Sequence, residues 1–322
     1  MARLPRNLRP TPILTRSRVV LEIASELVAD RDQPYNQAKV MLRAQGAADW
    51  PLALFGSSTV EGVDAVVKGE VALAIINPAA ALGFAYRGEP PFTAPQPVRS
   101  IGVIPTSDQI VFAVSRDFGL TSVEDIAANH CPLILGLRGQ HDHWLHAMLD
   151  HVLAAAGCSL DDIRSWGGGF TREGLLPYPD GPRFGALVDG TCNAIFDEAA
   201  HVWLNEAAQD FTILALSETT VIKLEALGYR RSTLKKKDYP GLPADVLTLE
   251  FSGWPIFVHA EAPDLLVTRI CAALDARKHN IPWEEEGPLP VERMCLDAPD
   301  TPQHVPLHRA AVDFWRQCGY LE

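Results

Sequence analysis

The chain has 322 residues, of which 47% are apolar and 21% are charged, and its formal net charge is −12. This length is sufficient for two lobes or for one large domain with a substantial core. The acidic balance argues against a nucleic-acid-binding protein, because phosphate contacts depend on an excess of Lys and Arg. No apolar stretch reaches the roughly 18 residues that a membrane span requires, so no transmembrane segment is predicted.

The start of the sequence does not resemble a secretion signal. Its apolar run at 19–29 contains Glu22 and Glu26, and it has no A-x-A cleavage pattern. The 6 cysteines form no C-x-x-C pair, so they fit neither a zinc knuckle nor a disulfide framework. We therefore predict a cytoplasmic protein, or a periplasmic one if the given sequence lacks the native N-terminus.

Strand-like and helix-like patterns alternate from the first elements onward. Residues 18–24 predict a strand, and "NQAKVMLRAQ" after Tyr35 predicts a helix. Strands follow at 51–56 and 71–76, each before a helix ("STVEGVDAVVKG" and "AAALGFAYRG") that ends at a glycine. After a proline-rich linker, "VRSIGVIP" and "QIVFAVSR" predict two further strands.

The alternation continues in the rest of the chain. A helix over "SVEDIAAN", a strand over "PLILGL" and a helix over "HWLHAMLDHVLAAAG" come first. A strand and glycine turn, "DIRSWGGGF", then lead to a helix over "RFGALVDG" and a buried strand over "CNAIFDEA". "FTILAL" predicts a strand, "TVIKLEALG" a helix, "DVLTLEFSGWPIFVHA" an extended pair and "APDLLVTRICAALDARK" a helix. This order is typical of an α/β fold with largely parallel sheets.

Polar residues follow several of the predicted strands, at the sheet edge where open α/β folds bind their ligands. Asn77 follows one strand, and Asp197 and Glu198 end another. Carboxylates on a buried strand are costly unless they are paired, cap a helix or serve a function, and helix capping is the plain explanation for Asp197. The strand ends are therefore the first places to expect a ligand.

Ser57, Ser58 and Thr59 precede the first of the glycine-ended helices. Ser58 and Glu61 form a capping-box pattern, so a plain N-cap explains Ser58 by itself. The free amides and the positive end of a helix dipole would also suit the carboxylate of a ligand. We include these three residues among the candidate ligand-binding residues.

The turn "RGQHDHW" contains Gln140, His141 and His143 at the mouth of a strand-to-helix connection. Asp142 as a helix cap is the plain interpretation of this turn. If the turn faces the two carboxylates of "IFDEA", imidazoles oppose carboxylates, which suits proton transfer or a divalent metal. The candidate metal ligands are His141, His143 and Glu198, but no H-E-x-x-H or other fixed metal spacing occurs, so no cofactor is firmly predicted.

The segments "FGSSTVEGVDAVVKGEVALAIINPAAALGFAYRG", "VRSIGVIPTSDQIVFAVSRDFGLTSVEDI", "LILGLRGQHDHW" and "ALVDGTCNAIFDEA" stand in an order that resembles the TAXI family, the solute-binding subunits of TRAP transporters. The resemblance runs roughly from Val19 to the helix at 263–277. It implies an α/β, two-lobed type II periplasmic-binding-protein-like fold with two hinge strands and a small acidic ligand in the cleft. One lobe would comprise 1–112 and 250–322, and the other 113–249.

The sequence departs from the family pattern at the expected cleft. It has no secretion signal, "ASELVADRDQPY" contains no glycine, and "RGQHDHW" replaces a small glycine-rich turn with serine or threonine. An extra segment, "TREGLLPYPDGP", lengthens the loop after "WGGGF". These departures weaken the case for transport and leave the case for ligand binding intact.

Two functions follow as hypotheses. The first is binding of a small organic carboxylate in the interlobe cleft, with TRAP membrane subunits as partners only if the protein is exported. The second is a cytoplasmic enzyme on the same fold, a lyase (decarboxylase) or isomerase that acts on an (aromatic) organic acid by decarboxylation, isomerisation or elimination. His141 or His143 would then act as acid/base or metal ligand. The predicted ligand-binding residues are Ser57, Ser58, Thr59, Asn77, Gln140, His141, His143, Asp197, Glu198 and Trp254.

Overall fold

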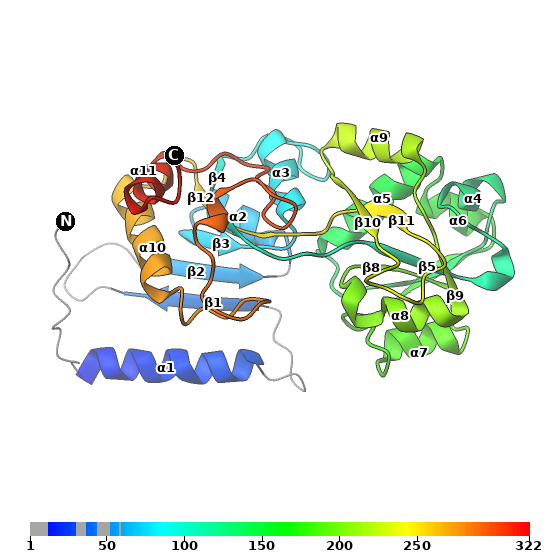
Figure 1. The fold of residues 1–322 in the computed structure, drawn as a ribbon, viewed down its shortest axis with the longest axis horizontal. Helices are drawn as coiled ribbons and strands as arrows, with labels where there is room; N and C mark the ends of the chain where they lie inside the picture. The colour runs from blue at the N-terminus through cyan, green and yellow to red at the C-terminus, as the bar shows by residue number, and fades with distance from the viewer. Residues whose placement is uncertain (1–11, 30–36, 44–51, 58) are drawn as a thin grey trace.

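The computed structural model describes residues 12–29, 37–43, 52–57 and 59–322 (Figure 1). Within these residues the chain forms two five-stranded sheets and one two-stranded sheet. Each five-stranded sheet is the centre of one lobe, and extended segments join the two lobes (Figure 1). No helix in this part of the chain is both long enough and apolar enough to cross a bilayer.

Lobe 1 is the body around the sheet with strand order β1-β2-β3-β12-β4. Its strands are β1 (Gln37–Leu42), β2 (Leu52–Ser57), β3 (Leu73–Ile75), β4 (Val98–Ile104) and β12 (Trp254–His259). Its helices are α2 (Glu61–Val67), α3 (Ala79–Arg87), α10 (Asp264–Arg277) and α11 (Arg309–Cys318), with a short 3₁₀ helix η2 (Arg293–Cys295). An exposed helix, α1 (Pro12–Ala29), precedes this sheet.

Lobe 2 is the body around the sheet with strand order β7-β6-β8-β5-β9. Its strands are β5 (Val111–Ser115), β6 (Ile134–Leu137), β7 (Gly169–Arg172), β8 (Ala194–Asp197) and β9 (Phe211–Ile213). Its helices are η1 (Arg116–Phe118), α4 (Glu124–Ala128), α5 (Trp144–Ala156), α6 (Leu160–Ser165), α7 (Pro182–Val188), α8 (Ala200–Asp210) and α9 (Glu218–Leu227). The small sheet pairs β10 (Arg231–Leu234) with β11 (Val246–Leu249).

In each large sheet, a strand that comes directly from the hinge lies antiparallel to both of its neighbours. In lobe 1, β12 lies antiparallel between β3 and β4, and in lobe 2, β5 lies antiparallel between β8 and β9. The segments before β5 and β12 pair at the hinge, where Ile110 N donates to Leu249 O at 3.1 Å and Phe251 N donates to Asp108 O at 2.9 Å. This arrangement confirms the predicted two-lobed α/β fold with two hinge strands, while the lobe boundaries at 112/113 and 249/250 stay a prediction. The prediction of largely parallel sheets is wrong, because both sheets are mixed and, among the strands that the structure describes, only β2 with β3, β6 with β7 and β6 with β8 pair in parallel.

Two predictions for the first elements are wrong. Residues 18–24 lie within helix α1 and do not form a strand, because Leu, Glu and Ala between the Val and Ile residues favour a helix. The segment after Tyr35 forms strand β1 and not a helix, because it pairs residue by residue with β2, from Gln37 opposite Ser57 to Leu42 opposite Leu52. This antiparallel pairing overrides the helix propensity of its residues.

A third wrong prediction concerns the strand at "DIRSW", which is helix α6. The helix begins at a capping box, in which Ser159 Oγ accepts from Asp162 N at 3.1 Å and Asp162 Oδ2 accepts from Ser159 N at 2.8 Å. The signal was present in the sequence as Ser-x-x-Asp before the segment. Strand β10, helix α8 and helix α11 were not predicted either, although α11 is strongly amphipathic, with Ala310, Ala311 and Trp315 on its buried face.

The glycine turn before β7 is required by packing at one position. A Cβ at Gly168 would lie 2.3 Å from Leu133 O, whereas a Cβ at Gly169 would meet no atom within 4 Å. Gly168→Ala is therefore expected to lower the free energy of unfolding by about 1–3 kcal/mol, and Gly169→Ala, the matched control, is expected to change it much less. Urea denaturation measures both values, and equal effects would show that the backbone approach does not constrain this turn.

An apolar cluster joins the two lobes beside the hinge. Phe84 of α3 in lobe 1 packs on Trp144 of α5 at a ring-centroid distance of 5.1 Å, and on Tyr229 after α9 at 4.7 Å. His151 of α5 stacks on the same ring at 5.5 Å. Phe84, Trp144 and Tyr229 are all buried. The lobes are thus held together by apolar contacts, and their separation would expose these rings to water.

Candidate functional site

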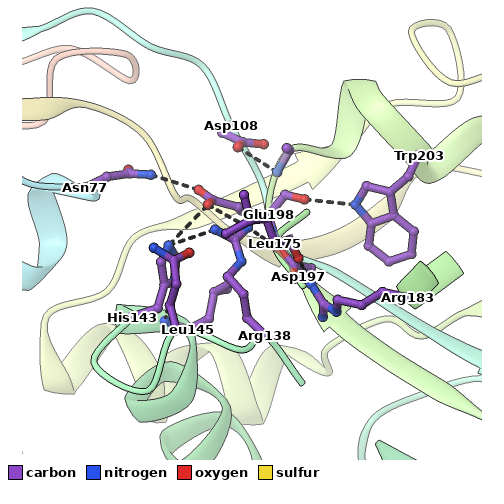
Figure 2. A network of polar contacts seen from close by, with 12 residues as sticks. Asn77, Asp108, Arg138, His143, Leu145, Leu175, Arg183, Asp197, Glu198 and Trp203 are labelled. Carbon is purple, nitrogen blue, oxygen red and sulfur yellow. Dashed lines mark hydrogen bonds and ion pairs between the residues drawn. The ribbon is translucent and has the colours of Figure 1, made fainter. Parts of the chain in front are cut away.

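The ends of three strands meet where the lobes face each other (Figure 2). Asn77 follows β3 of lobe 1, Arg138 follows β6 of lobe 2, and Asp197 and Glu198 stand at the end of β8. Strands β6 and β8 are parallel neighbours, so their carboxyl ends reach the same sheet edge. The side chains that the sequence places after separate strands therefore form one polar cluster, which we call the interlobe cluster (Asn77, Asp108, Arg138, His143, Arg183, Asp197 and Glu198).

Two arginines and two carboxylates form a buried ionic network at its centre. Arg138 Nη2 lies 2.5 Å from Asp197 Oδ1 and 2.9 Å from Glu198 Oε1. Arg183 pairs through Nη1 with Asp197 Oδ2 and donates from Nη2 to Gly136 O at 2.7 Å. The exposed fraction of each of these four charged side chains is 8% or less. Such charges are tolerated in the interior only because each finds a partner.

The protonation states of the carboxyl groups follow from this pairing. Burial alone would raise the pKa of Asp197, but Arg138 and Arg183 hold that pKa below its usual value. The pKa of Glu198 is also below its usual value, because Arg138 and His143 outweigh the effect of burial, which acts to raise it. The pKa of Asp108 lies well above its usual value, because burial and the charge of Glu198 both disfavour its ionised form. The two arginine charges are thus balanced by Asp197 and Glu198 alone.

The backbone after Glu198 is strained and firmly held. Ala199 has a φ of 56°, in the left-handed region that costs a non-glycine residue about 1 kcal/mol or more. Asp108 Oδ2, from the hinge segment, accepts the hydrogen of Ala199 N at 2.7 Å. Trp203 Nε1 donates to Glu198 O at 2.9 Å. The hinge segment and α8 therefore fix the direction in which Glu198 points.

Asn77 links the two lobes through this cluster. Its Nδ2 donates to Glu198 Oε2 at 2.9 Å, so the amide of lobe 1 and the carboxylate of lobe 2 are in direct contact (Figure 2). Among the described residues, Asn77 Oδ1 and Arg138 Nε are buried and have no hydrogen-bond partner. Buried polar atoms without a protein partner are uncommon, and they mark positions where a ligand can make a hydrogen bond. Both unpartnered atoms belong to residues that contact Glu198.

His143 is a buried neutral imidazole with two competing partners. Its Nδ1 accepts from Leu145 N at 3.3 Å and caps α5, and its Nε2 lies 2.9 Å from Arg138 Nη1 and 3.4 Å from Glu198 Oε1. Burial and the charge of Arg138 lower the pKa of His143, which keeps the ring neutral. A neutral ring has a single acceptor nitrogen, so it serves either Leu145 or Arg138 at one time. In the tautomer that caps α5, Nε2 carries the hydrogen and faces Glu198.

The structure brings together only part of the predicted site. His141 lies on the exposed side of its turn, away from the buried ring of His143, and Gln140 is partly buried. Trp254 is partly buried and packs against the apolar cluster of lobe 1 that surrounds Ile256. The ligand-binding roles of these residues stay predictions.

The residues after β2 pair with each other. Ser57 Oγ lies 2.8 Å from Thr59 Oγ1 and also accepts from Thr59 N at 3.1 Å. Thr59 is buried, with 1% of its surface exposed. Ser58, the predicted capping residue, lies outside the described residues. Helix α2 has no side-chain cap in the part of the chain that the structure describes.

Within the described ranges, no group of three or more His, Cys, Asp or Glu side chains is arranged to hold a metal ion. His143 and Glu198 are neighbours, but His141 is exposed and does not join them. Arg138 lies between the two carboxylates, where its guanidinium supplies the positive charge that such a pair requires. The divalent metal stays a prediction that this geometry does not favour.

Sequence reasoning missed Arg138, Arg183 and Asp108. Arg138 directly follows the apolar strand "LILGL". A cation at the end of a buried strand could have been matched to the carboxylates at the end of "CNAIFDEA", because buried carboxylates require a cation. Arg183 stands in the first turn of α7 and gave no such signal. Asp108 belongs to the hinge segment "TSDQ", which reads as an ordinary polar loop.

No protein-family model matches the chain, and no curated protein matches it. A protein of known structure from Bordetella bronchiseptica RB50 is similar at 16% identity, with a TM-score of 0.39 over 69% of this chain and 58% of that one. PhnD1 from Prochlorococcus marinus (MIT 9301), in complex with methylphosphonate, is 12% identical with a TM-score of 0.41 over 81% and 84% of the two chains.

MatC from Rhodopseudomonas palustris, with bound malate, is 14% identical, with a TM-score of 0.38 over 81% of this chain and 82% of that one. The chain thus spans 58% of the length of the Bordetella protein and more than four fifths of the other two. With TM-scores this low, nothing about the ligand of this chain follows from these similarities.

Proposed function

We propose that the chain binds a small organic carboxylate between its lobes, in the manner of a solute-binding protein. The observation that carries this proposal is the contact of Asn77 Nδ2 with Glu198 Oε2 at 2.9 Å across the lobes, beside buried polar atoms that lack partners. A ligand at this point would contact both lobes at once. The two-lobed fold with paired hinge segments supports such a role.

The chemistry of the interlobe cluster suits an acid that also carries a hydrogen-bond donor. Arg138 is the group that would bind the carboxylate, through its buried Nε, which has no partner among the described residues, because a charge-assisted hydrogen bond to a carboxylate is strong. Asn77 Oδ1 would accept from a hydroxyl or amino group of the ligand. The raised pKa of Asp108 keeps a third negative charge out of the cluster, which reduces repulsion of an incoming anion.

The finer assignments belong to the same proposal. Membership of the TAXI family, a TRAP membrane partner and the ligand roles of Ser57, Ser58, Thr59, Gln140 and Trp254 rest on the sequence resemblance. Ser57, Thr59 and Trp254 have a further common support in the position of β2, β3 and β12 next to one another in the sheet of lobe 1, whereas Gln140 lies in lobe 2, in the turn after β6. A ligand that reaches this edge of lobe 1 from the interlobe cluster would meet the first three.

The proposal predicts saturable binding of a carboxylate and loss of affinity on removal of the interlobe contact. Isothermal titration with aliphatic, hydroxylated and aromatic carboxylates, each paired with its uncharged amide, is expected to show binding of an acid and not of its amide. Asn77→Ala is expected to weaken that binding about tenfold, the value of one hydrogen bond. Asn280→Ala serves as the matched control, because Asn280 is an exposed asparagine that follows α10. Equal binding of acids and amides would contradict the proposal.

A second candidate function is an enzyme that acts on an organic acid by decarboxylation, isomerisation or elimination. One observation favours it: the pKa of Asp108 is raised and that of Glu198 is lowered, and neighbouring carboxyl groups with separated pKa values are typical of acid/base pairs. The test is to incubate the chain with each bound acid and to follow products by NMR. An activity that survives replacement of both His141 and His143 with Ala would exclude a role for the histidines.

A further inference from the structure

The two hinge segments present different residues on their two faces. Asp108 and Phe251 face the interlobe cluster: Asp108 accepts from Ala199 N, and the ring of Phe251 stacks on His143 at 6.1 Å with an interplanar angle of 9°. The residues on either side of them face the opposite way, as alternation along an extended chain requires. Ser107, Gln109, Glu250 and Ser252 thereby line a separate hollow behind the hinge, which we call the hinge pocket.

The hinge pocket has a volume of about 310 Å³ and is lined by three parts of the chain. The hinge segments form one wall, Arg230 and Ser232 of the β10 region form another, and Asp297 stands on the side of lobe 1. This volume is in the range of pockets that hold small molecules. A molecule in the hinge pocket would contact both lobes and the hinge, without touching the interlobe cluster.

Some of the charged groups around the hinge pocket have ion-pair partners, and one carboxyl oxygen among the described residues there lacks a hydrogen-bond partner. Arg230 pairs with Asp297 at 2.7 Å, and Arg231 pairs with Glu225 at 2.7 Å. Glu250 is 8% exposed, and its Oε1 has no hydrogen-bond partner in the described part of the chain. The atom that lacks a partner is therefore one oxygen of a buried carboxyl group, to which Ser252 also hydrogen-bonds, and a buried carboxylate gains most from a cation.

We propose that the hinge pocket binds a small organic amine whose ammonium group pairs with Glu250 and whose remaining donors bind the serine hydroxyls of the pocket. An anion fits less well, because both arginines are already paired with carboxylates. This site shares no lining residue with the interlobe cluster, although Ser252 Oγ accepts from Asp108 N at 3.0 Å, and it is separate from the place where the carboxylate is proposed to bind. Occupancy would stabilise the arrangement of the lobes seen here, since the ligand contacts both of them.

The pH dependence of amine binding has a defined sign. Burial raises the pKa of Glu250 to about 7; Arg230 opposes this rise, and Asp297 and Asp300 add to it. Arg230, Arg231, Asp297 and Asp300 are the other charged groups around Glu250. Amine affinity is therefore expected to increase as the pH rises through about 7, where Glu250 ionises.

The test compares ethanolamine with ethylene glycol, which has a hydroxyl in place of the ammonium group. Ethanolamine is expected to raise the Tm of the full chain in a saturable way and to shift the NMR signals of 107–109, 230–232 and 250–252, while ethylene glycol does neither. Glu250→Gln, a neutral side chain of the same shape, is expected to reduce amine affinity at least about tenfold. Asn77→Ala is expected to leave amine binding unchanged and to affect only the carboxylate.

Three outcomes would overturn the proposal: equal effects of the amine and the alcohol, unchanged amine affinity in Glu250→Gln, or NMR shifts confined to other parts of the chain. The NMR comparison is made on the unmodified protein, so it decides the question even if the variant fails to fold. Failure of the carboxylate titration would not bear on this site, because no residue of the interlobe cluster lines the hinge pocket.

Discussion

Replacement of Asp197 with Ala is expected to lower the free energy of unfolding by about 3–5 kcal/mol, the cost of breaking a buried ion pair. Asp197 is 0% exposed and accepts from both Arg138 and Arg183. Its removal leaves Arg183 without an acidic partner among the described residues and Arg138 with Glu198 alone. Neither guanidinium can lose its proton to escape the interior, because the pKa of arginine is too high. Urea denaturation with a constant m-value measures the change.

The matched control for this variant is Asp161→Ala. Asp161 also pairs with an arginine, Arg164 at 2.9 Å, but its side chain is 87% exposed. Its loss is expected to change the free energy of unfolding by at most about 1 kcal/mol. Similar losses in the two variants would mean that water reaches the interlobe cluster, and the network would then not be the buried structural element described above. A higher stability of Asp197→Ala would have the same meaning.

The sequence predicts the strands of this fold better than it predicts the contents of the site. The apolar runs "PLILGL" and "CNAIFDEA" are short, bounded and buried, and both form strands of the lobe 2 sheet. Their order also indicates that "RGQHDHW" and Asp197 reach the same sheet edge, and His143 and Glu198 do lie 3.4 Å apart. Strand β1 shows the limit, because only its pairing with β2 makes "QAKVML" a strand.

The polar partners could be predicted only in part, because partners lie far apart in the sequence. Two carboxylates at the end of a buried strand require cations, so basic side chains are expected near them in the fold. The sequence does not show which arginines these are. Arg138 is 59 residues from Asp197 along the chain, and Asn77 is 121 residues from Glu198. The sequence also does not show which histidine of the turn points inward, because this depends on the geometry of the turn. In the structure, the side chain of His143 caps α5, whereas His141 is exposed.

Phe84→Ala is expected to lower the free energy of unfolding by about 3–5 kcal/mol and to separate the lobes in solution. Phe84 is fully buried and contacts Trp144, His151 and Tyr229 of lobe 2, while Phe92 of lobe 1 stacks on Trp144 at 6.5 Å. Its removal leaves a cavity between the lobes and takes away the aromatic contacts that hold α3 against α5. Small-angle X-ray scattering is expected to report a larger radius of gyration for the variant than for the unmodified chain.

Phe314→Ala distinguishes a loss of lobe contact from a general loss of stability. Phe314 packs edge-on against Trp315 at 5.1 Å, entirely within lobe 1. Its replacement is expected to destabilise the chain without a change in the radius of gyration. If the interlobe cluster binds a carboxylate, saturation with that ligand is expected to return the Phe84→Ala variant toward the compact state, since the ligand contacts both lobes. An unchanged radius of gyration for Phe84→Ala would mean that the paired hinge segments, and not the aromatic contact, hold the lobes together.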